Sequence, residues 1–392
     1  MKPRISQQEF KERVTRTQIE MKKENLDLLL CFSNEAEPQF VRYYSNYWPS
    51  FEFAGLLIPQ QGDAILLIGP ESMTYAKHVS SIQIIRRLLA FRESSNPDYP
   101  GADLDTYASI LKNDLDLESV NKVGIAGYGL ITHQIYEDFE TAMSDLGAKE
   151  IVNADDVVSK IRIEKSPMEI ACLKEAYRIA SVAMNKVIEK IKVGMTENEV
   201  KGIALERILA EGAEAEGYPF WILTGEDSNQ AVSRVRNKVI QAGDLVQAQV
   251  AARYEGYVAS IGRPIVMGKA TPEQKALVEA GYTVQERMLE AIKPGVEAKA
   301  ISDLHYNTLN ELGFADHILY GPAHGTGLME NEHPWVESNS EYQFRENMTF
   351  CTCLYLGNDE KKIGIRVEDG FVINSDGVEV FGNAKNGLIE II

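Results

Sequence analysis

The chain has 392 residues, of which 44% are hydrophobic and 25% are charged, a profile typical of water-soluble globular domains. Its length predicts two or three domains, each with its own core. The formal net charge of −18 argues against binding to nucleic acid or to an anionic membrane surface, because both are polyanions. No stretch of the sequence reaches the roughly 20 apolar residues that are needed to cross a bilayer.

The amino terminus and the cysteines indicate a cellular compartment. Residues 1–20 are highly charged and lack the apolar core of a signal peptide. Four cysteines are too few for a disulfide framework, and Cys351 and Cys353 lie too close on one predicted strand to pair with each other. We therefore predict reduced thiols and a cytoplasmic protein.

Strands and helices alternate in the first part of the sequence. A charged amphipathic helix is predicted over 7–25 and is followed by an apolar strand over 26–32. The further elements predicted here are a hairpin over 53–68, a helix after Glu71, a strand near 82–85, a helix around 104–117, a strand at 122–126 and a helix at 133–147. This alternation predicts an α/β domain with a mixed or parallel sheet over residues 1–155.

The second part has longer helices and many strands. Ser166 and Pro167 begin a helix that runs to about residue 192, and Thr196 is the predicted N-cap of the next helix. Strands are then predicted at 219–224, 244–253, 257–267, 348–356, 363–367 and 370–373, and helices at 272–292 and 297–312. Helices beside a largely antiparallel sheet predict an α+β domain over residues 160–392.

Five short motifs follow one another along about 210 residues. They are Arg162–Ile170, which reads R-x-x-K-S-x-x-E-I; Gly243–Val246 with Gly256, Tyr257 and Arg263; His324–Leu328 with Glu332 and Pro334; Asn347–Phe350; and Gly364–Asp369. In this order they resemble the creatinase/prolidase family. The resemblance implies a creatinase-type α/β amino-terminal domain and a pita-bread α+β catalytic domain. It also implies a homodimer in which the amino-terminal domain completes the partner's active site.

The resemblance also identifies five positions for metal ligands. The metallopeptidase branch holds two divalent ions with two Asp, one His and two Glu, and here those positions are Gln249, Ser260, His324, Cys353 and Glu368. One remaining carboxylate cannot offset the charge of two ions held close together. We therefore predict no metal and no other cofactor. One alternative stays open, a single zinc ion on His324, Cys353 and Glu368.

Creatinase and ectoine hydrolase are similar to this pattern, since their metal ligands are also replaced. The resemblance implies metal-independent hydrolysis of a C–N bond in a small amidine, guanidino or amide-like substrate. The candidate catalytic residues are His324, Glu368 and Glu332, because an imidazole can protonate a leaving nitrogen and a carboxylate can activate water. The candidate substrate-binding residues are Gln249, Ser260, Arg366, Cys353, Phe51 and Glu52.

Two departures separate this sequence from creatinase itself. Residues 231–234 contain no histidine where creatinase has its catalytic one, and Gly262 stands where creatinase has a glutamate. Two other functions therefore stay open. One is an Xaa-Pro dipeptidase or aminopeptidase that needs metal, and the other is a non-catalytic binding protein with the same fold. In each case the expected ligand is a small molecule.

Overall fold

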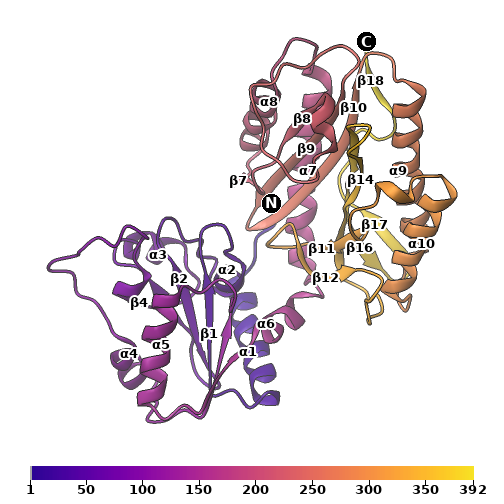
Figure 1. Ribbon diagram of the computed structural model, residues 1–392. Helices are drawn as coiled ribbons and strands as arrows, with labels where there is room; N and C mark the ends of the chain where they lie inside the picture. Colours follow the sequence, from indigo (N-terminus) through magenta and orange to yellow (C-terminus); the bar gives the residue numbers. More distant parts are fainter. Residues whose placement is uncertain (1) are drawn as a thin grey trace. The chain divides into compact units, whose positions relative to one another are not determined.

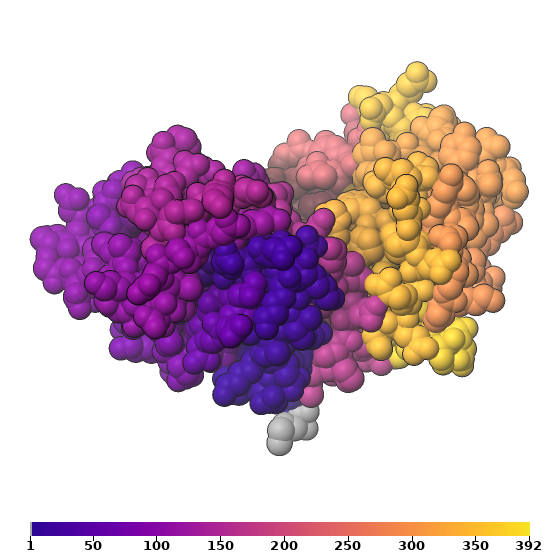
Figure 2. All heavy atoms as spheres, turned by 90° about the horizontal axis from the view of Figure 1, so that it is seen from below, coloured from indigo at the N-terminus to yellow at the C-terminus, as the bar shows by residue number. Residues whose placement is uncertain are grey.

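The computed structural model describes residues 2–392, which divide into two units (Figure 1). The amino-terminal unit is Ile5–Arg162, and the carboxy-terminal unit is Ile163–Ile392 together with residues 2–4. Each unit has its own buried hydrophobic core. Figure 2 shows the surface atoms, with the amino-terminal unit in indigo to purple and the carboxy-terminal unit in magenta to yellow. In the described part of the chain, no helix is both long and apolar enough to span a membrane.

A six-stranded mixed sheet forms the centre of the amino-terminal unit, in the order β4-β3-β2-β1-β5-β6. β1 is antiparallel to β2 and parallel to β5. The strands are β1 (Leu28–Ser33), β2 (Ala54–Pro59), β3 (Ile65–Ile68), β4 (Ile84–Arg87), β5 (Lys122–Ala126) and β6 (Glu150–Asn153). Every residue of β1, β2 and β3 is buried, which explains why these strands are continuous apolar runs in the sequence.

Six α-helices and one short 3₁₀ helix accompany this sheet. They are α1 (Gln7–Lys23), α2 (Gln39–Ser45), α3 (Met73–Val79), η1 (Leu89–Phe91), α4 (Tyr107–Asn113), α5 (His133–Asp145) and α6 (Asp155–Arg162). The helix predicted around 104–117 is shorter in the structure. It begins after Thr106, whose side-chain oxygen accepts a hydrogen bond from the backbone amide of Ser109 and so caps the helix.

The carboxy-terminal unit contains three sheets. One has the order β18-β10-β9-β7, with β8 also paired to β9; another has the order β12-β11-β13-β16-β17; and β14 pairs with β15 alone. The strands are β7 (Ala215–Glu216), β8 (Ile222–Thr224), β9 (Leu245–Tyr254), β10 (Tyr257–Met267), β11 (Ala323–Gly325), β12 (Glu332–Val336), β13 (Thr349–Thr352), β14 (Leu354–Asn358), β15 (Ile363–Val367), β16 (Gly370–Asn374), β17 (Gly377–Val380) and β18 (Ile389–Ile391).

Four α-helices and two 3₁₀ helices belong to this unit. They are α7 (Pro167–Lys190), α8 (Glu197–Ala210), η2 (Gly225–Asn229), α9 (Pro272–Ala291), α10 (Ala298–Glu311) and η3 (Ala315–His317). The predicted starts of α7 and α8 are confirmed. The side chain of Ser166 accepts from the Glu169 amide and that of Thr196 accepts from the Glu199 amide, each in a reciprocal capping box.

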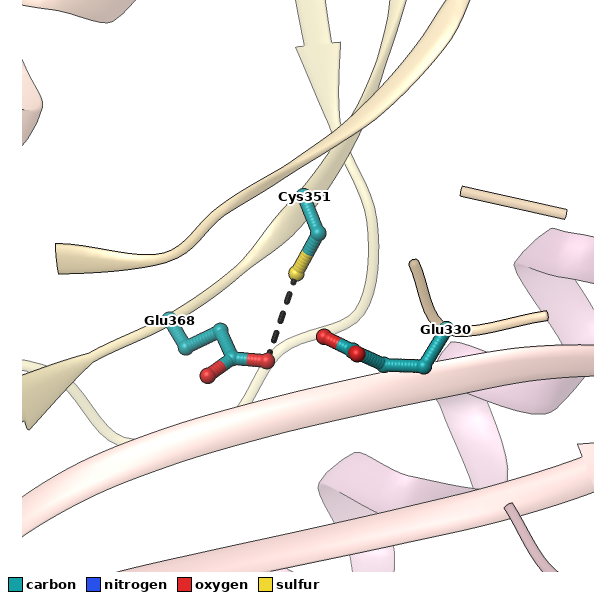
Figure 3. A group of neighbouring side chains, drawn as sticks. All are labelled: Glu330, Cys351 and Glu368. Carbon is teal, nitrogen blue, oxygen red and sulfur yellow. Dashed lines mark hydrogen bonds between the residues drawn. The ribbon is translucent and has the colours of Figure 1, made fainter. Parts of the chain in front are cut away.

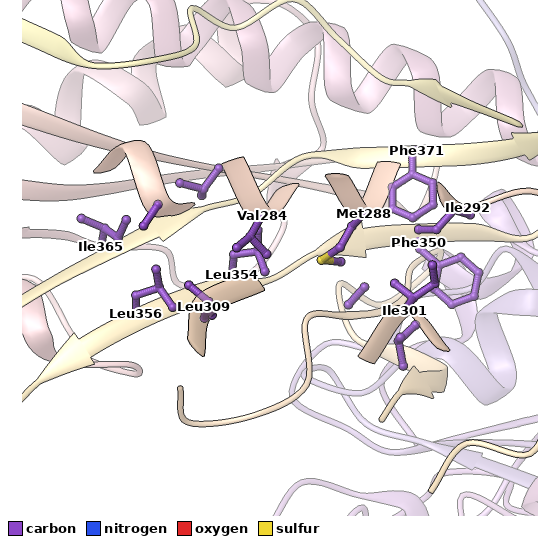
Figure 4. Close-up of a cluster of buried hydrophobic side chains, with 14 of the residues drawn as sticks. Val284, Met288, Ile292, Ile301, Leu309, Phe350, Leu354, Leu356, Ile365 and Phe371 are labelled. Carbon is purple, nitrogen blue, oxygen red and sulfur yellow. The ribbon is translucent and has the colours of Figure 1, made fainter. Parts of the chain in front are cut away.

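Apolar side chains of α9 and α10 pack against β13, β14, β15 and β16 to form a large hydrophobic core (Figure 4). Val284 and Met288 of α9 lie beside Leu354 and Phe371 of the strands in this core. The packed strands give the residues at their ends a fixed backbone, which is what a functional site requires.

The single strand predicted over 348–356 is wrong, because the chain changes sheets at Cys353. β13 pairs with β11 and β16, whereas β14 pairs with β15. The amide of Cys353 donates to the carbonyl of Pro322 and so leaves the ladder at this point. The sequence alternation is the same on both sides of the break, and only the pairing partners distinguish the two strands.

Candidate active site

Two hairpin strands supply the first wall of the candidate site. β9 carries Gln249 and β10 carries Ser260, both about 1% exposed. Gln249 lies opposite Gly262 across the hairpin. A Cβ atom at Gly262 would lie 2.9 Å from the Cβ of Glu368, so only glycine allows the hairpin to approach the strand that carries Glu368.

Three further strands supply the opposite wall. His324 of β11 lies directly across from Cys351 of β13, and Glu368 follows β15 and forms a bridge with Gly262 of the hairpin. His324, Cys351 and Glu368 are buried. Residues that are up to 119 positions apart in the sequence therefore meet at one point.

A chain of hydrogen bonds links the two walls. The amide nitrogen of Gln249 donates to Oε2 of Glu368 at 2.6 Å. The hydroxyl of Tyr218 donates to the amide oxygen of Gln249 at 3.0 Å and lies 2.7 Å from the hydroxyl of Ser260. The hairpin side is thus neutral, and its polar atoms hold one carboxylate oxygen of Glu368 in place.

The other wall is ionic. Nε2 of His324 lies 3.2 Å from Oε1 of Glu330, which comes from the loop between β11 and β12. Nδ1 of His324 lies 3.0 Å from the carbonyl oxygen of Gly325, so this nitrogen donates to it. Nη1 of Arg366 donates to Sγ of Cys353 at 2.9 Å and lies 3.7 Å from Oε2 of Glu368.

Aromatic rings surround Arg366. Its guanidinium carbon lies 5.6 Å from the ring centroid of Trp221, 5.7 Å from that of Tyr355 and 6.0 Å from that of Tyr320. Cation–π attraction is strongest where water is excluded. The rings therefore fix a permanent positive charge beside Glu368.

Burial and neighbouring charges shift the pKa values of the acids and of the imidazole. Burial, followed by the charge of Glu330, raises the pKa of Glu368 to about 7. Burial alone would lower the pKa of His324, but the Glu330 carboxylate beside it raises this pKa well above its usual range. Burial opposes ionisation of Glu330 too, and the positive charge of His324 outweighs it and lowers the pKa of Glu330.

Three side chains converge more closely than the rest. Glu330, Cys351 and Glu368 each direct one donor atom toward the others (Figure 3), and these atoms all lie within 4.8 Å of one another. We call this group the donor cluster. Sγ of Cys351 donates to Oε1 of Glu368 at 3.5 Å, the oxygen that Gln249 leaves free.

The structure brings six of the nine predicted site residues together, namely His324, Glu368, Gln249, Ser260, Arg366 and Cys353. Glu332 is directed elsewhere. Its carboxylate accepts from the amide of Met329 at 3.0 Å and lies 3.5 Å from Nζ of Lys165. The Glu332 carboxylate therefore lies against the glycine-rich loop. It lies so close that a Cβ atom at Gly327 would be 2.8 Å from it.

Phe51 and Glu52 belong to the amino-terminal unit. Phe51 is 81% exposed and has a φ of 60°, which is unusual for a bulky residue. Glu52 is buried, and its carboxylate accepts from the amides of Glu71 and Ser72 and from the Ser72 hydroxyl before α3. Both carboxylate oxygens of Glu52 therefore accept hydrogen bonds from residues of the amino-terminal unit itself. The homodimer and the role of Phe51 stay predictions.

Sequence reasoning missed Glu330, Cys351 and Tyr218. Glu330 follows His324 by six residues in the glycine-rich loop, and this short spacing was the available signal. Cys351 lies two residues before the family position Cys353, and only the pairing of β11 with β13 places it opposite His324. Tyr218 has no signal in the sequence, because its role depends on contacts with both hairpin strands.

Two family models match this chain. The model of the creatinase/prolidase N-terminal domain matches residues 13–163, and that of metallopeptidase family M24 matches residues 171–375, more than half of the chain. The chain belongs to metallopeptidase family M24. It is a hydrolase of the creatinase/prolidase family that acts on C–N bonds, as the motifs predicted, and the predicted pair of domain types is confirmed.

Individual relatives of this family member match over most of its length. The Xaa-Pro dipeptidase of Pyrococcus furiosus is 29% identical over 377 residues, which cover 94% of this chain and 100% of the relative. The Xaa-Pro dipeptidase of Pyrococcus horikoshii is 28% identical over 333 residues, which cover 84% of this chain and 89% of the relative. The crystal structure of the prolidase from Pyrococcus horikoshii OT3 superposes with a TM-score of 0.81 at 26% identity, over 96% of this chain and 100% of that one.

The prediction of a metal-independent hydrolase of amidine or guanidino substrates is contradicted by these matches. The family is one of metallopeptidases, and the relatives that match nearly the whole chain are Xaa-Pro dipeptidases. The prediction counted carboxylates only at the five family positions. The fold adds Glu330 and Cys351 at the same place, so more side chains there can ligate a metal ion than the motifs indicate. The Xaa-Pro peptidase alternative is favoured instead.

Proposed function

We propose that this protein is an Xaa-Pro dipeptidase that uses a divalent metal ion at the site between β9–β10 and β11, β13 and β15. One observation carries the proposal. A chain that is similar to an Xaa-Pro dipeptidase over 94% of its length also gathers two carboxylates and a thiol within 4.8 Å of one another.

The residues present do not fit a pair of ions. Gln249 directs its amide nitrogen, a hydrogen-bond donor, toward Glu368 and its oxygen toward Tyr218, and Ser260 also lies against Tyr218. The hairpin wall therefore presents no anionic ligand. A single ion fits the opposite wall, where Glu330, Cys351 and Glu368 can hold it. Such an ion would polarise the scissile carbonyl and lower the pKa of the attacking water.

The remaining groups of the site have roles in binding and proton transfer. His324 is the proton donor, because its Nε2 carries a proton toward Glu330 and can pass it to the proline nitrogen as the C–N bond breaks. Arg366 provides a fixed positive charge beside the carboxylates. Burial excludes water from the site and strengthens each of these electrostatic interactions.

Purified protein tests the proposal with a panel of Xaa-Pro dipeptides and matched Xaa-Ala dipeptides. We expect hydrolysis of the Xaa-Pro members that a chelator abolishes and that one added divalent metal restores. The variant Cys31→Ser, which replaces a buried cysteine of β1 in the amino-terminal unit, is the control for the loss of a buried thiol. Hydrolysis that a chelator leaves unchanged, or a protein inactive on every Xaa-Pro dipeptide with every metal, contradicts the proposal.

A second candidate function is the binding of a peptide-like ligand without turnover. The closed hydrogen-bond chain through Tyr218, Gln249, Ser260 and Glu368 favours it, because these groups already satisfy one another. The same panel distinguishes the two functions. Saturable binding of a dipeptide, measured by calorimetry, with no release of proline in the presence of metal would support the binding protein.

A further inference from the structure

We propose that the donor cluster binds one divalent transition-metal ion through Glu330, Cys351 and Glu368. Glu330 and Cys351 are not at the five family positions, so this ligand set differs from the one that the family motifs indicate. The inference rests on the proposed function, since the ion would serve the same site, but it concerns the number of ions and the atoms that hold them.

The geometry of the cluster is the first argument. Its three donor atoms lie within 4.8 Å of one another and come from separate segments: the loop after β11, the strand β13 and the end of β15 (Figure 3). Metal–ligand bonds of about 2.0–2.3 Å in a tetrahedral site place ligand atoms roughly 3.3–3.8 Å apart. Of the three side chains, that of Glu330 is partly exposed, so it is the one with room to rotate toward an ion.

The surroundings of Glu368 are the second argument. Its Oε2 is held by Gln249 at 2.6 Å and faces Arg366 at 3.7 Å. Its Oε1 accepts from the Cys351 thiol at 3.5 Å, and a thiol is a weak donor. One oxygen is thus fixed by hydrogen bonding and the other is directed at the cluster, as in metal sites where outer groups orient the ligands.

Charge is the third argument. Two carboxylates that face each other at this distance repel unless a proton or a cation lies between them. A thiolate added to two carboxylates carries three negative charges, which a divalent ion and the neighbouring Arg366 balance. A second ion would find only Gln249 and Ser260 on its side, and neither is an anion. The site therefore fits one ion.

The ligand types select the class of ion. Thiolate favours zinc and other late transition metals, whereas magnesium, calcium and manganese prefer oxygen ligands alone. We expect Zn²⁺ or Co²⁺ to bind more tightly than Mn²⁺ or Mg²⁺. A sulfur ligand also supplies a spectroscopic signature, because a thiolate bound to Co²⁺ has a charge-transfer absorption in the near ultraviolet that oxygen ligands lack.

The test is a titration of metal-free, reduced protein with Co²⁺, followed by absorption and by metal analysis after gel filtration. We expect one equivalent of cobalt and a sulfur-to-cobalt band. Cys351→Ser should remove the band and weaken Co²⁺ binding by more than about 10-fold. Cys353→Ser should keep the band, and it is the matched control because it removes the neighbouring thiol, whose sulfur lies against Arg366. Glu330→Gln should weaken binding by a similar factor and keep a weaker band.

Each result has a definite meaning. Two equivalents of cobalt, no cobalt at all, or a band that survives in Cys351→Ser would overturn the inference. Thermal melting of each metal-free variant shows that it is folded, and Glu330→Gln serves as the second ligand variant if Cys351→Ser does not fold. The titration needs no turnover. A sulfur-to-cobalt band with one equivalent of cobalt supports the metal site even if no Xaa-Pro dipeptide is cleaved. The lack of cleavage would then count against the proposed function alone.

Discussion

The two walls of the candidate site differ in kind. On the β9–β10 hairpin, Gln249 and Ser260 are neutral and are tied to Tyr218 by hydrogen bonds. On the opposite wall, Glu330, Glu368, His324 and Arg366 are charged and lie in close pairs. A hydrogen-bonded neutral wall is stable by itself, whereas a charged buried wall depends on how its charges are balanced. We therefore place the proposed chemistry on the second wall.

The largest expected effect comes from removing the imidazole of the charged wall. His324→Gln takes away the proton donor, and we expect kcat for Xaa-Pro hydrolysis to fall by about 10²- to 10⁴-fold. Steady-state kinetics measure this change. His317→Gln replaces another buried histidine of the same unit, outside the site, and should keep kcat within a small factor. A His324 variant as active as the wild type would remove His324 from the mechanism.

Carboxylates in place of Gln249 and Ser260 would make the neutral wall charged, like the opposite wall. The double change Gln249→Asp with Ser260→Asp should destabilise the metal-free protein by on the order of 3–5 kcal/mol, because it buries unpaired negative charge beside Glu368. It should also raise the cobalt stoichiometry from one to two. Urea unfolding and metal analysis measure the two effects.

The control for this double change is Gln249→Asn with Ser260→Asn, which has the same shape and no charge. It should lose less stability and keep one equivalent of cobalt. Equal destabilisation in both double variants, with one ion in each, would show that the charge of the hairpin wall does not decide how many ions bind.

A second buried histidine, His305, shows how burial shifts the pKa of an imidazole that does not have the Glu330 carboxylate beside it. Burial lowers the pKa of His305 in α10 to about 4, whereas that of His324 is raised. His305 is neutral in the folded protein and binds a proton on unfolding below its usual pKa of about 6.5. Stability from this residue is therefore present above about pH 6.5 and is lost as the pH falls toward 4.

When the pH falls from about 7.5 to about 5, the unfolded chain binds a proton at His305 that the folded protein does not. We expect this to lower the free energy of unfolding by about 2 kcal/mol. His305→Gln should reduce the pH dependence by that amount in urea titrations at the two pH values. An unchanged slope in the variant would mean that His305 does not carry the effect.

The smallest expected effect tests how closely the two walls approach. In Gly262→Ala the new Cβ would lie 2.9 Å from Cβ of Glu368 and 3.1 Å from Cγ of Arg366, so we expect a loss of about 1–3 kcal/mol from overpacking. Gly202→Ala in α8 is the control, because a Cβ there meets no atom within 4 Å. Thermal melting compares them, and equal melting temperatures would indicate that the hairpin can move away.

Much of the fold could be predicted from the sequence. The apolar runs of β1 and β2 and the caps at Ser166 and Thr196 are local signals, since each depends on residues within a few positions of one another. The break at Cys353 could not be predicted, because it depends on which strands pair with the segments before and after it. Pairing over long sequence separations leaves no local pattern.

The sequence by itself determined the family, through five ordered motifs, and the identity of the residues at its five ligand positions. Only the tertiary structure decided which other side chains join them. Glu330 approaches Glu368 and Cys351 because a glycine-rich loop, a strand end and a neighbouring sheet meet at one point. A motif gives ligand positions along the chain, whereas a metal ion can bind any suitable donor atom that the fold brings close to it, whatever its place in the sequence.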